Sequence, residues 1–142
     1  MATKSAETKS AGKPFAHALI VEDDAILAMS LEDAFRRSGT HEVTVVSTMK
    51  ATMEALNDGA KPDVIILDVH LADRDDGWAI AELVSLLGAK LPKIVFSTGA
   101  PQDIPGEIAE MGTVFEKPYD PDVLVEKLTA SRRLGPFAKL RR

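Results

Sequence analysis

Five short apolar runs alternate along this chain with segments in which apolar residues recur at helical spacing. The apolar runs occupy residues 16–21, 43–46, 63–67, 93–97 and 113–116, and the helical segments follow them over residues 25–37, 49–56, 78–87, 107–111 and 121–134. Runs that are apolar at successive positions are typical of strands buried on both faces of a sheet. Strands that alternate with helices favour a parallel sheet with right-handed crossovers. The sequence therefore predicts a doubly wound α/β fold, with a five-stranded parallel sheet and helices on both faces.

One domain of this kind is expected, because 142 residues suffice for a single sizeable core. We expect a flexible leader at residues 1–14, the domain at residues 15–134 and a basic tail at residues 135–142, where a Gly-Pro pair should end the last helix. Pro105 and Gly106 interrupt the fourth helical segment. That helix is therefore predicted to be short or irregular.

Composition narrows the class of protein. The chain has no cysteine, which excludes a disulfide framework and a thiolate metal site. It has neither an apolar signal sequence nor an apolar run of the roughly 18 residues that span a bilayer, so we expect a cytoplasmic protein without a membrane span. Five of the 17 basic residues lie within the last 11 positions, which leaves the rest of the chain acidic. An acidic body disfavours nucleic acid as the main partner, and no DNA-binding domain is expected.

Polar side chains follow four of the predicted strands. The four positions, after the first, third, fourth and fifth strands, are Glu22-Asp23, Asp68, Thr98 and Lys117. Parallel strands end at one edge of their sheet, and ligands of such folds bind outside that edge. Three carboxylates, a hydroxyl and an ammonium group gathered there suit a divalent metal ion and a phosphoryl group.

The acidic residues have more than one reading. Mg²⁺ prefers oxygen ligands and usually takes one or two carboxylates, so Asp23 and Asp68 can bind it directly and Glu22 through water. Mn²⁺ is an alternative ion for the same ligands. Taken alone, Asp23 and Asp24 are explained more simply as acids that cap the next helix. Asp68 could act as a general base, a metal ligand or a nucleophile, and carboxylate nucleophiles do accept phosphoryl groups.

These residues together resemble the receiver domain of two-component response regulators, and the resemblance covers about residues 16–134. It implies a flavodoxin-like receiver fold. The family's acidic pair corresponds to Glu22 and Asp23, and its phosphorylated aspartate corresponds to Asp68. The resemblance thus implies Mg²⁺-dependent phosphorylation of Asp68.

Further residues match the family's site, and one departs from it. The resemblance makes Thr98 the switch hydroxyl and Lys117 the phosphoryl-binding lysine. It makes the backbone carbonyl of His70 a metal ligand, while the imidazole of His70 is expected to be a partly exposed loop group. Receivers usually carry an aromatic residue three positions before the lysine, where this chain has Val114. Phe115 comes one position later and should face the other side of the strand.

Two stretches are similar to a narrower receiver subfamily with a Phe-Ala-Thr-Gly-Tyr signature. Members of that subfamily are often stand-alone and are served by alphaproteobacterial sensor kinases. The stretches are residues 67–71 and 96–100, and within the second one Ser97 and Ala100 depart from the signature.

The function expected from this resemblance is that of a single-domain response regulator rather than an enzyme. A sensor histidine kinase or a histidine phosphotransfer protein would phosphorylate Asp68, and the output would be phosphorelay or binding to a downstream protein that the sequence does not identify. One alternative is a Mg²⁺-dependent phosphatase. Such enzymes typically carry a second aspartate two residues after the first, where this chain has His70, and this difference disfavours the alternative. Another is a binding module that does not use phosphorylation, which Val114 and the short fourth helix favour.

Overall fold

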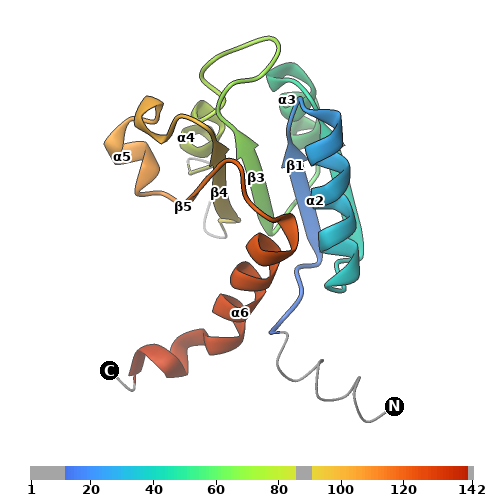
Figure 1. Ribbon diagram of the computed structural model, residues 1–142, viewed down its shortest axis with the longest axis vertical. Helices are drawn as coiled ribbons and strands as arrows, with labels where there is room; N and C mark the ends of the chain where they lie inside the picture. The colour runs from blue at the N-terminus through green and yellow to red at the C-terminus, as the bar shows by residue number, and fades with distance from the viewer. Residues whose placement is uncertain (1–11, 86–90, 141–142) are drawn as a thin grey trace.

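A five-stranded parallel sheet forms the centre of the protein. The structure, a computed structural model, describes residues 12–85 and 91–140, and of residues 133–140 it describes the backbone only. The strands stand in the order β2-β1-β3-β4-β5, and Figure 1 shows β1, β3 and β4 side by side in the middle of the molecule. Their bounds are β1 His17–Val21, β2 Glu42–Val46, β3 Val64–Asp68, β4 Lys93–Thr98 and β5 Thr113–Glu116.

Helices cover both faces of the sheet. The described residues form five α-helices and one short 3₁₀ helix, η1; their bounds are α2 Ala25–Arg37, α3 Met49–Asn57, α4 Ala79–Ser85, η1 Pro101–Asp103, α5 Gly106–Ala109 and α6 Pro121–Leu140. Core residues of α2 and α6 pack on one face, and those of α3, α4 and α5 pack on the other. The predicted doubly wound α/β fold is confirmed.

Strands β1 and β3 are buried at every position. Leu19 and Ile65 belong to the core beneath α3, α4 and α5, whereas Ile20 and Ile66 belong to the core beneath α2 and α6. This two-sided burial explains why the strands read as continuous apolar runs. It also means that a polar residue in line with these strands can reach water only where the strand ends.

The start of α2 is fixed by a side-chain cap. The carboxylate of Asp24 accepts hydrogen bonds from the backbone N–H groups of Ile26 at 3.0 Å and Leu27 at 3.1 Å. These bonds satisfy two of the N–H groups that a helix start leaves without an internal partner. Asp24 is therefore engaged in capping, and the two acids before it, Glu22 and Asp23, lie in the turn between β1 and α2.

The fourth helical segment is short, as the sequence predicts. It consists of the three-residue η1 and the four-residue α5. The predicted end of the last helix at Leu134 is wrong, because α6 runs through Gly135 and Pro136 to Leu140. Proline removes one helical N–H group and bends the helix without having to end it, and Figure 1 shows α6 change direction along its length.

The N-terminal segment lies against α6. Residues 1–11 of the predicted leader are outside the described residues, but the backbone carbonyl of Pro14 accepts a hydrogen bond from Arg132 at 2.8 Å. The Arg132 guanidinium also lies 4.3 Å from the centre of the Phe15 ring, a cation–π contact. Within residues 12–85 and 91–140, no helix combines the length and the apolar character needed to cross a membrane.

Candidate phosphoryl and metal site

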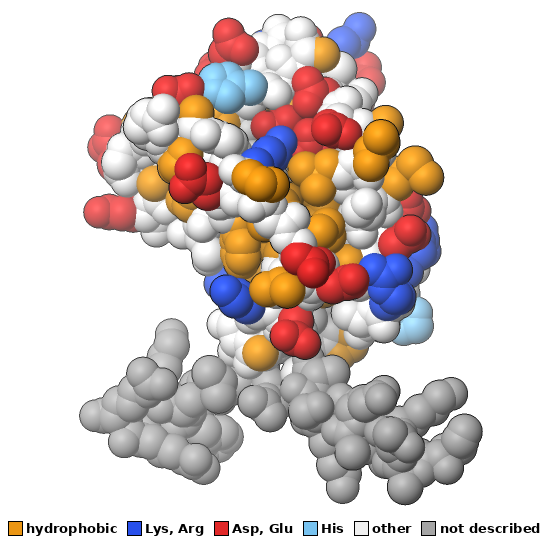
Figure 2. Space-filling model, viewed as in Figure 1, with side chains coloured by type: hydrophobic (Ala, Val, Ile, Leu, Met, Phe, Trp, Pro, Cys, Tyr) orange, Lys and Arg blue, Asp and Glu red, His pale blue; other side chains and the backbone are white. Residues whose placement is uncertain are grey.

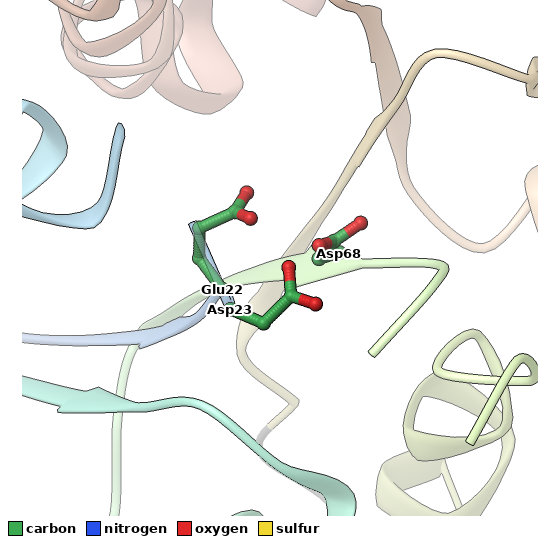
Figure 3. A group of neighbouring side chains, drawn as sticks. All are labelled: Glu22, Asp23 and Asp68. Atoms are coloured by element: carbon green, nitrogen blue, oxygen red, sulfur yellow. The ribbon is translucent and has the colours of Figure 1, made fainter. Parts of the chain in front are cut away.

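Three carboxyl groups meet at the carboxyl edge of the sheet. Glu22 and Asp23 follow β1, Asp68 is the last residue of β3, and one oxygen of each lies within 4.8 Å of the others. Figure 3 shows the three side chains converging from these two neighbouring strands. Glu22 and Asp68 are buried, whereas Asp23 is exposed. The structure therefore brings together the three acids that the sequence predicts to share one site.

Lys117 is the cation of this cluster. Its Nζ lies 3.0 Å from Oε1 of Glu22 and 3.5 Å from Oδ1 of Asp68. The other carboxylate oxygen of Glu22 accepts a hydrogen bond from the backbone N–H of Asp24 at 3.0 Å. One oxygen of this fully buried carboxylate therefore accepts a hydrogen bond, whereas Oε1 accepts none and is compensated by the charge of Lys117 alone. The carboxylates in turn raise the pKa of Lys117 although burial opposes its charge.

The carboxyl group of Asp68 is difficult to ionise in the metal-free protein. Its side chain is only 6% exposed. Burial, together with the neighbouring carboxylate of Glu22, raises the pKa of Asp68 to about 7 although the charge of Lys117 lowers it. One ammonium group does not compensate three carboxylates, so the cluster favours a further cation.

Thr98 ends β4 at the same edge and is buried. Its hydroxyl oxygen accepts a hydrogen bond from the backbone N–H of Ala100 at 2.9 Å, and its carbonyl oxygen accepts one from the backbone N–H of Lys117 at 2.8 Å. The hydroxyl proton is not used in the bond to Ala100. Thr98 can therefore donate to an oxygen atom of a bound group while its backbone fastens the turn that carries Lys117.

His70 lies on the loop after β3, and its side chain is 45% exposed. Its backbone N–H donates to Oδ1 of Asp68 at 3.2 Å. Its imidazole Nε2 lies 2.9 Å from Oδ2 of Asp103, and Nδ1 lies 3.6 Å from Oδ1 of Asp75. The imidazole thus links the loop after β3 to η1. The role of the His70 carbonyl as a metal ligand stays a prediction.

Val114 occupies the position at which receivers usually carry an aromatic residue. Val114 lies on β5 opposite Phe96 of β4 and is 36% exposed. Phe115 turns to the other face, where it packs against the core beneath α2 and α6, as predicted. On that same face the hydroxyl of Tyr119 lies 2.7 Å from the hydroxyl of Ser97. The sequence signal for this contact is a serine directly after the apolar residues of β4.

Gly77 lets the loop after β3 pack closely against the backbone of Asp68. A Cβ atom at this position would lie 2.2 Å from the carbonyl oxygen of Asp68 and 3.0 Å from that of Val69. The N–H of Gly77 donates to the Val69 carbonyl at 2.9 Å. Only glycine lets the backbone of the loop come this close to the end of β3. The sequence analysis did not single out Gly77, because this requirement depends on a contact with another segment.

The surface beside the acids is hollowed and partly apolar. A cavity of about 420 Å³ opens between α2, β2 and α3, and its lining includes Glu22, Asp23, Met29 and Val45. On α2, Ile26 is 78% exposed and Met29 is 65% exposed. Figure 2 shows acidic side chains gathered in the upper part of this face, with hydrophobic side chains to their right. A partner that reaches the acids can therefore also contact an apolar flank.

The donor set fits a divalent cation that prefers oxygen. Glu22, Asp23 and Asp68 supply carboxylate oxygens, the ligand type that Mg²⁺ and Mn²⁺ select. The raised pKa of Asp68 reports the burial and the neighbouring negative charge that such an ion would compensate. Asp23, which is exposed, is the acid through which an ion from solvent can enter.

Mg²⁺ is expected to stabilise the fold through these acids. At a Mg²⁺ concentration ten times its dissociation constant, the free energy of unfolding should rise by about 1.4 kcal/mol, because only the folded chain holds the acids together. Asp23→Asn should lose this gain. Asp24→Asn is the matched control, since asparagine also caps helices. Because Asp24 is not one of the three acids of the site, this variant should still be stabilised by Mg²⁺. Urea denaturation with and without Mg²⁺ measures the effect, and equal gains in both variants would contradict it.

Comparisons with known proteins agree with this arrangement. Residues 18–129 match the family model described as the response regulator receiver domain. Among curated proteins, the chain is 29% identical over 105 residues to the phyllosphere-induced regulator PhyR of Methylorubrum extorquens, covering 72% of this chain and 38% of PhyR. It is 34% identical over 88 residues to the sensory transduction protein LytT of Enterococcus faecalis, covering 61% of this chain and 35% of LytT. The chain thus spans little more than a third of either relative.

Solved structures show the same fold. A CheY-like response regulator receiver domain from Methylobacillus flagellatus has a TM-score of 0.64 at 23% identity, covering 89% of this chain and 98% of that one. The anti-anti-sigma factor PhyR from Bartonella quintana has a TM-score of 0.66 at 22% identity, covering 99% of this chain and 56% of that one. At these identities the likeness concerns the fold.

Proposed function

Because the chain belongs to the response regulator receiver domain family, we propose that it accepts a phosphoryl group on Asp68 in a Mg²⁺-dependent reaction. The observation that carries the proposal is the position of Asp68, whose carboxyl group lies within reach of Glu22, Asp23 and Lys117 at the sheet edge. The donor is the phosphohistidine of a sensor histidine kinase or of a histidine phosphotransfer protein.

The transfer exchanges one bond to phosphorus for another. A carboxylate oxygen of Asp68 attacks the phosphorus atom, a P–O bond forms, and the P–N bond to the donor imidazole breaks. The imidazole leaves with the bonding electron pair and takes up a proton, and Asp68 becomes an acyl phosphate. Asp23, Asp68 and the backbone carbonyl of His70 would hold Mg²⁺, with Glu22 acting through water, and the ion would supply charge neutralisation.

Two further side chains bind the oxygen atoms of the phosphoryl group once it is on Asp68. The ammonium group of Lys117, already 3.5 Å from Asp68, offsets the negative charge of an incoming phosphoryl oxygen. The Thr98 hydroxyl donates its free proton to a second oxygen. Its backbone also binds the Lys117 turn, so a movement of Thr98 toward the phosphoryl group reaches both β4 and β5.

Mass spectrometry of the intact protein tests this function. Incubation with acetyl phosphate and Mg²⁺ should add one phosphoryl group to the wild-type chain and none to Asp68→Asn. Asp75→Asn serves as the matched control, since Asp75 is an exposed acid on the same loop, and it should be phosphorylated like wild type. A wild-type chain that gains no phosphoryl group, or an Asp68→Asn chain that still gains one, would overturn the proposal.

The output we propose is binding to another protein or relay of the phosphoryl group, in the cytoplasm, without turnover of a small-molecule substrate. Val114 and the shortened η1–α5 segment favour a second candidate, a receiver-like module that binds its partner without phosphorylation. Partner binding that is equal for wild type and Asp68→Asn would select this second candidate. Steady hydrolysis of a small phosphate ester that depends on Asp68 would instead indicate a phosphatase.

A further inference from the structure

A partly buried hydrogen bond between two hydroxyl groups lies beside the phosphoryl site. Tyr119 comes two residues after Lys117, and its Oη lies 2.7 Å from Oγ of Ser97. Ser97 is fully buried in β4. The Tyr119 ring packs edge-on against Phe115, with the ring centres 6.1 Å apart and the planes at 65°. The tyrosine is therefore held both by its ring and by its hydroxyl.

Each of these hydroxyl groups needs the other. A buried hydroxyl that lacks a hydrogen bond costs free energy, and buried tyrosines usually find a partner for their O–H. Ser97 directly follows the apolar stretch Ile94, Val95, Phe96 of β4 and is fully buried like Val95 and Phe96. An aliphatic residue would suit the burial of that position at least as well as serine. The polar pair therefore calls for a reason beyond packing.

The pair fastens the turn that carries Lys117. In the sheet, Ser97 stands between Asp68 on β3 and Phe115 on β5. The backbone N–H of Lys117 donates to the carbonyl of Thr98, the residue after Ser97, at 2.8 Å. The turn is thus joined to the end of β4 at Lys117 itself and again two residues later through the side chain of Tyr119.

The Tyr119 hydroxyl also lies within the electric field of the acids. Burial raises the pKa of Tyr119, its bond to Ser97 acts against this, and the negative charge of Glu22 raises the pKa further. The phenol therefore stays protonated at neutral pH and remains a hydrogen-bonding group.

We propose that Tyr119 is a positioning residue for phosphoryl acceptance, which holds the turn so that the Lys117 ammonium stays 3.0 Å from Glu22 and 3.5 Å from Asp68. The inference rests on the function proposed above and adds a residue to it. Tyr119 acts through Lys117 and does not touch the phosphoryl group. Its hydroxyl is the part that matters, since the ring alone can still pack on Phe115.

Three variants test the inference: Tyr119→Phe, Ser97→Ala and the double variant. Each is measured for its phosphorylation rate with acetyl phosphate and Mg²⁺ and for its free energy of unfolding in urea. Tyr119→Phe should slow phosphorylation roughly three- to tenfold, the effect of one lost hydrogen bond on a barrier. Thr52→Val is the matched control, because it removes from α3 a hydroxyl whose residue is as buried as Ser97, and its rate should equal that of wild type.

The double variant separates positioning from folding. With neither hydroxyl left without its partner, it should regain stability relative to the single variants, while its phosphorylation stays slow because the turn is still unfastened. A rate that recovers together with stability, or a Tyr119→Phe rate equal to that of wild type, would overturn this inference alone. A wild-type chain that takes up no phosphoryl group would overturn the proposed function and this inference with it.

Discussion

Replacing Lys117 by glutamine should slow the phosphorylation of Asp68 by acetyl phosphate about 100- to 1,000-fold. A preorganised donor aimed at developing negative charge in a partly dry site has an effect of about this size on catalysis. Lys117 is such a group, because its side chain is largely buried and its ammonium group lies close to the carboxylates of Glu22 and Asp68. Glutamine keeps hydrogen-bond donors, on a side chain one bond shorter, but has no charge to offset the carboxylates or the incoming phosphoryl oxygens.

A second lysine provides the matched control for this prediction. Lys93 begins β4 at the opposite edge of the sheet, so Lys93→Gln changes the net charge by the same amount without touching the site. Its phosphorylation rate should stay within about twofold of wild type, since exposed charges at a distance are screened by salt. A decrease of less than about fivefold in Lys117→Gln, measured by intact mass over time, would show that the ammonium group does not stabilise the transfer.

The position of the site could be predicted from the sequence because a strand that is buried on both faces is apolar at consecutive positions. A run such as Val64-Ile65-Ile66-Leu67 favours a strand with both faces covered, and a carboxylate that follows it, Asp68, is then expected at the end of that strand. The same holds for Glu22 after β1, which is buried at every position. Lys117 follows β5, an edge strand with no fully buried position, and its place at this edge follows from the parallel direction of β5 instead. Parallel strands end on one side, so the acids and the lysine had to converge whatever the details of the loops.

Contacts that depend on tertiary packing could not be predicted in this way. The bond between Ser97 and Tyr119 needs the β4–β5 register and the turn after Lys117 to be in place before the two hydroxyl groups can meet. Gly77 is required only because its loop packs against the backbone of Asp68. The end of α6 was predicted too early for a related reason, since a Gly-Pro pair weakens a helix locally while the rest of the helix continues.

Asp68→Asn should stabilise the metal-free protein at pH 8 by about 2 kcal/mol, and by less at pH 5. The pKa of Asp68 is about 7 in the folded chain against an ordinary value of 3.8, so between these values the folded chain holds a proton that the unfolded chain has lost. Wild-type stability therefore falls as pH rises from about 4 to about 7, whereas asparagine has no proton to lose. The full shift, in which the attraction to Lys117 is already included, corresponds to about 4 kcal/mol, and screening by solvent at the sheet edge reduces the expected effect to about half of that. Urea denaturation in a chelator measures the difference; Asp75→Asn should show none, and a gain independent of pH would contradict the prediction. With Mg²⁺ present the order should reverse, because the carboxylate that destabilises the empty site is the one that holds the ion.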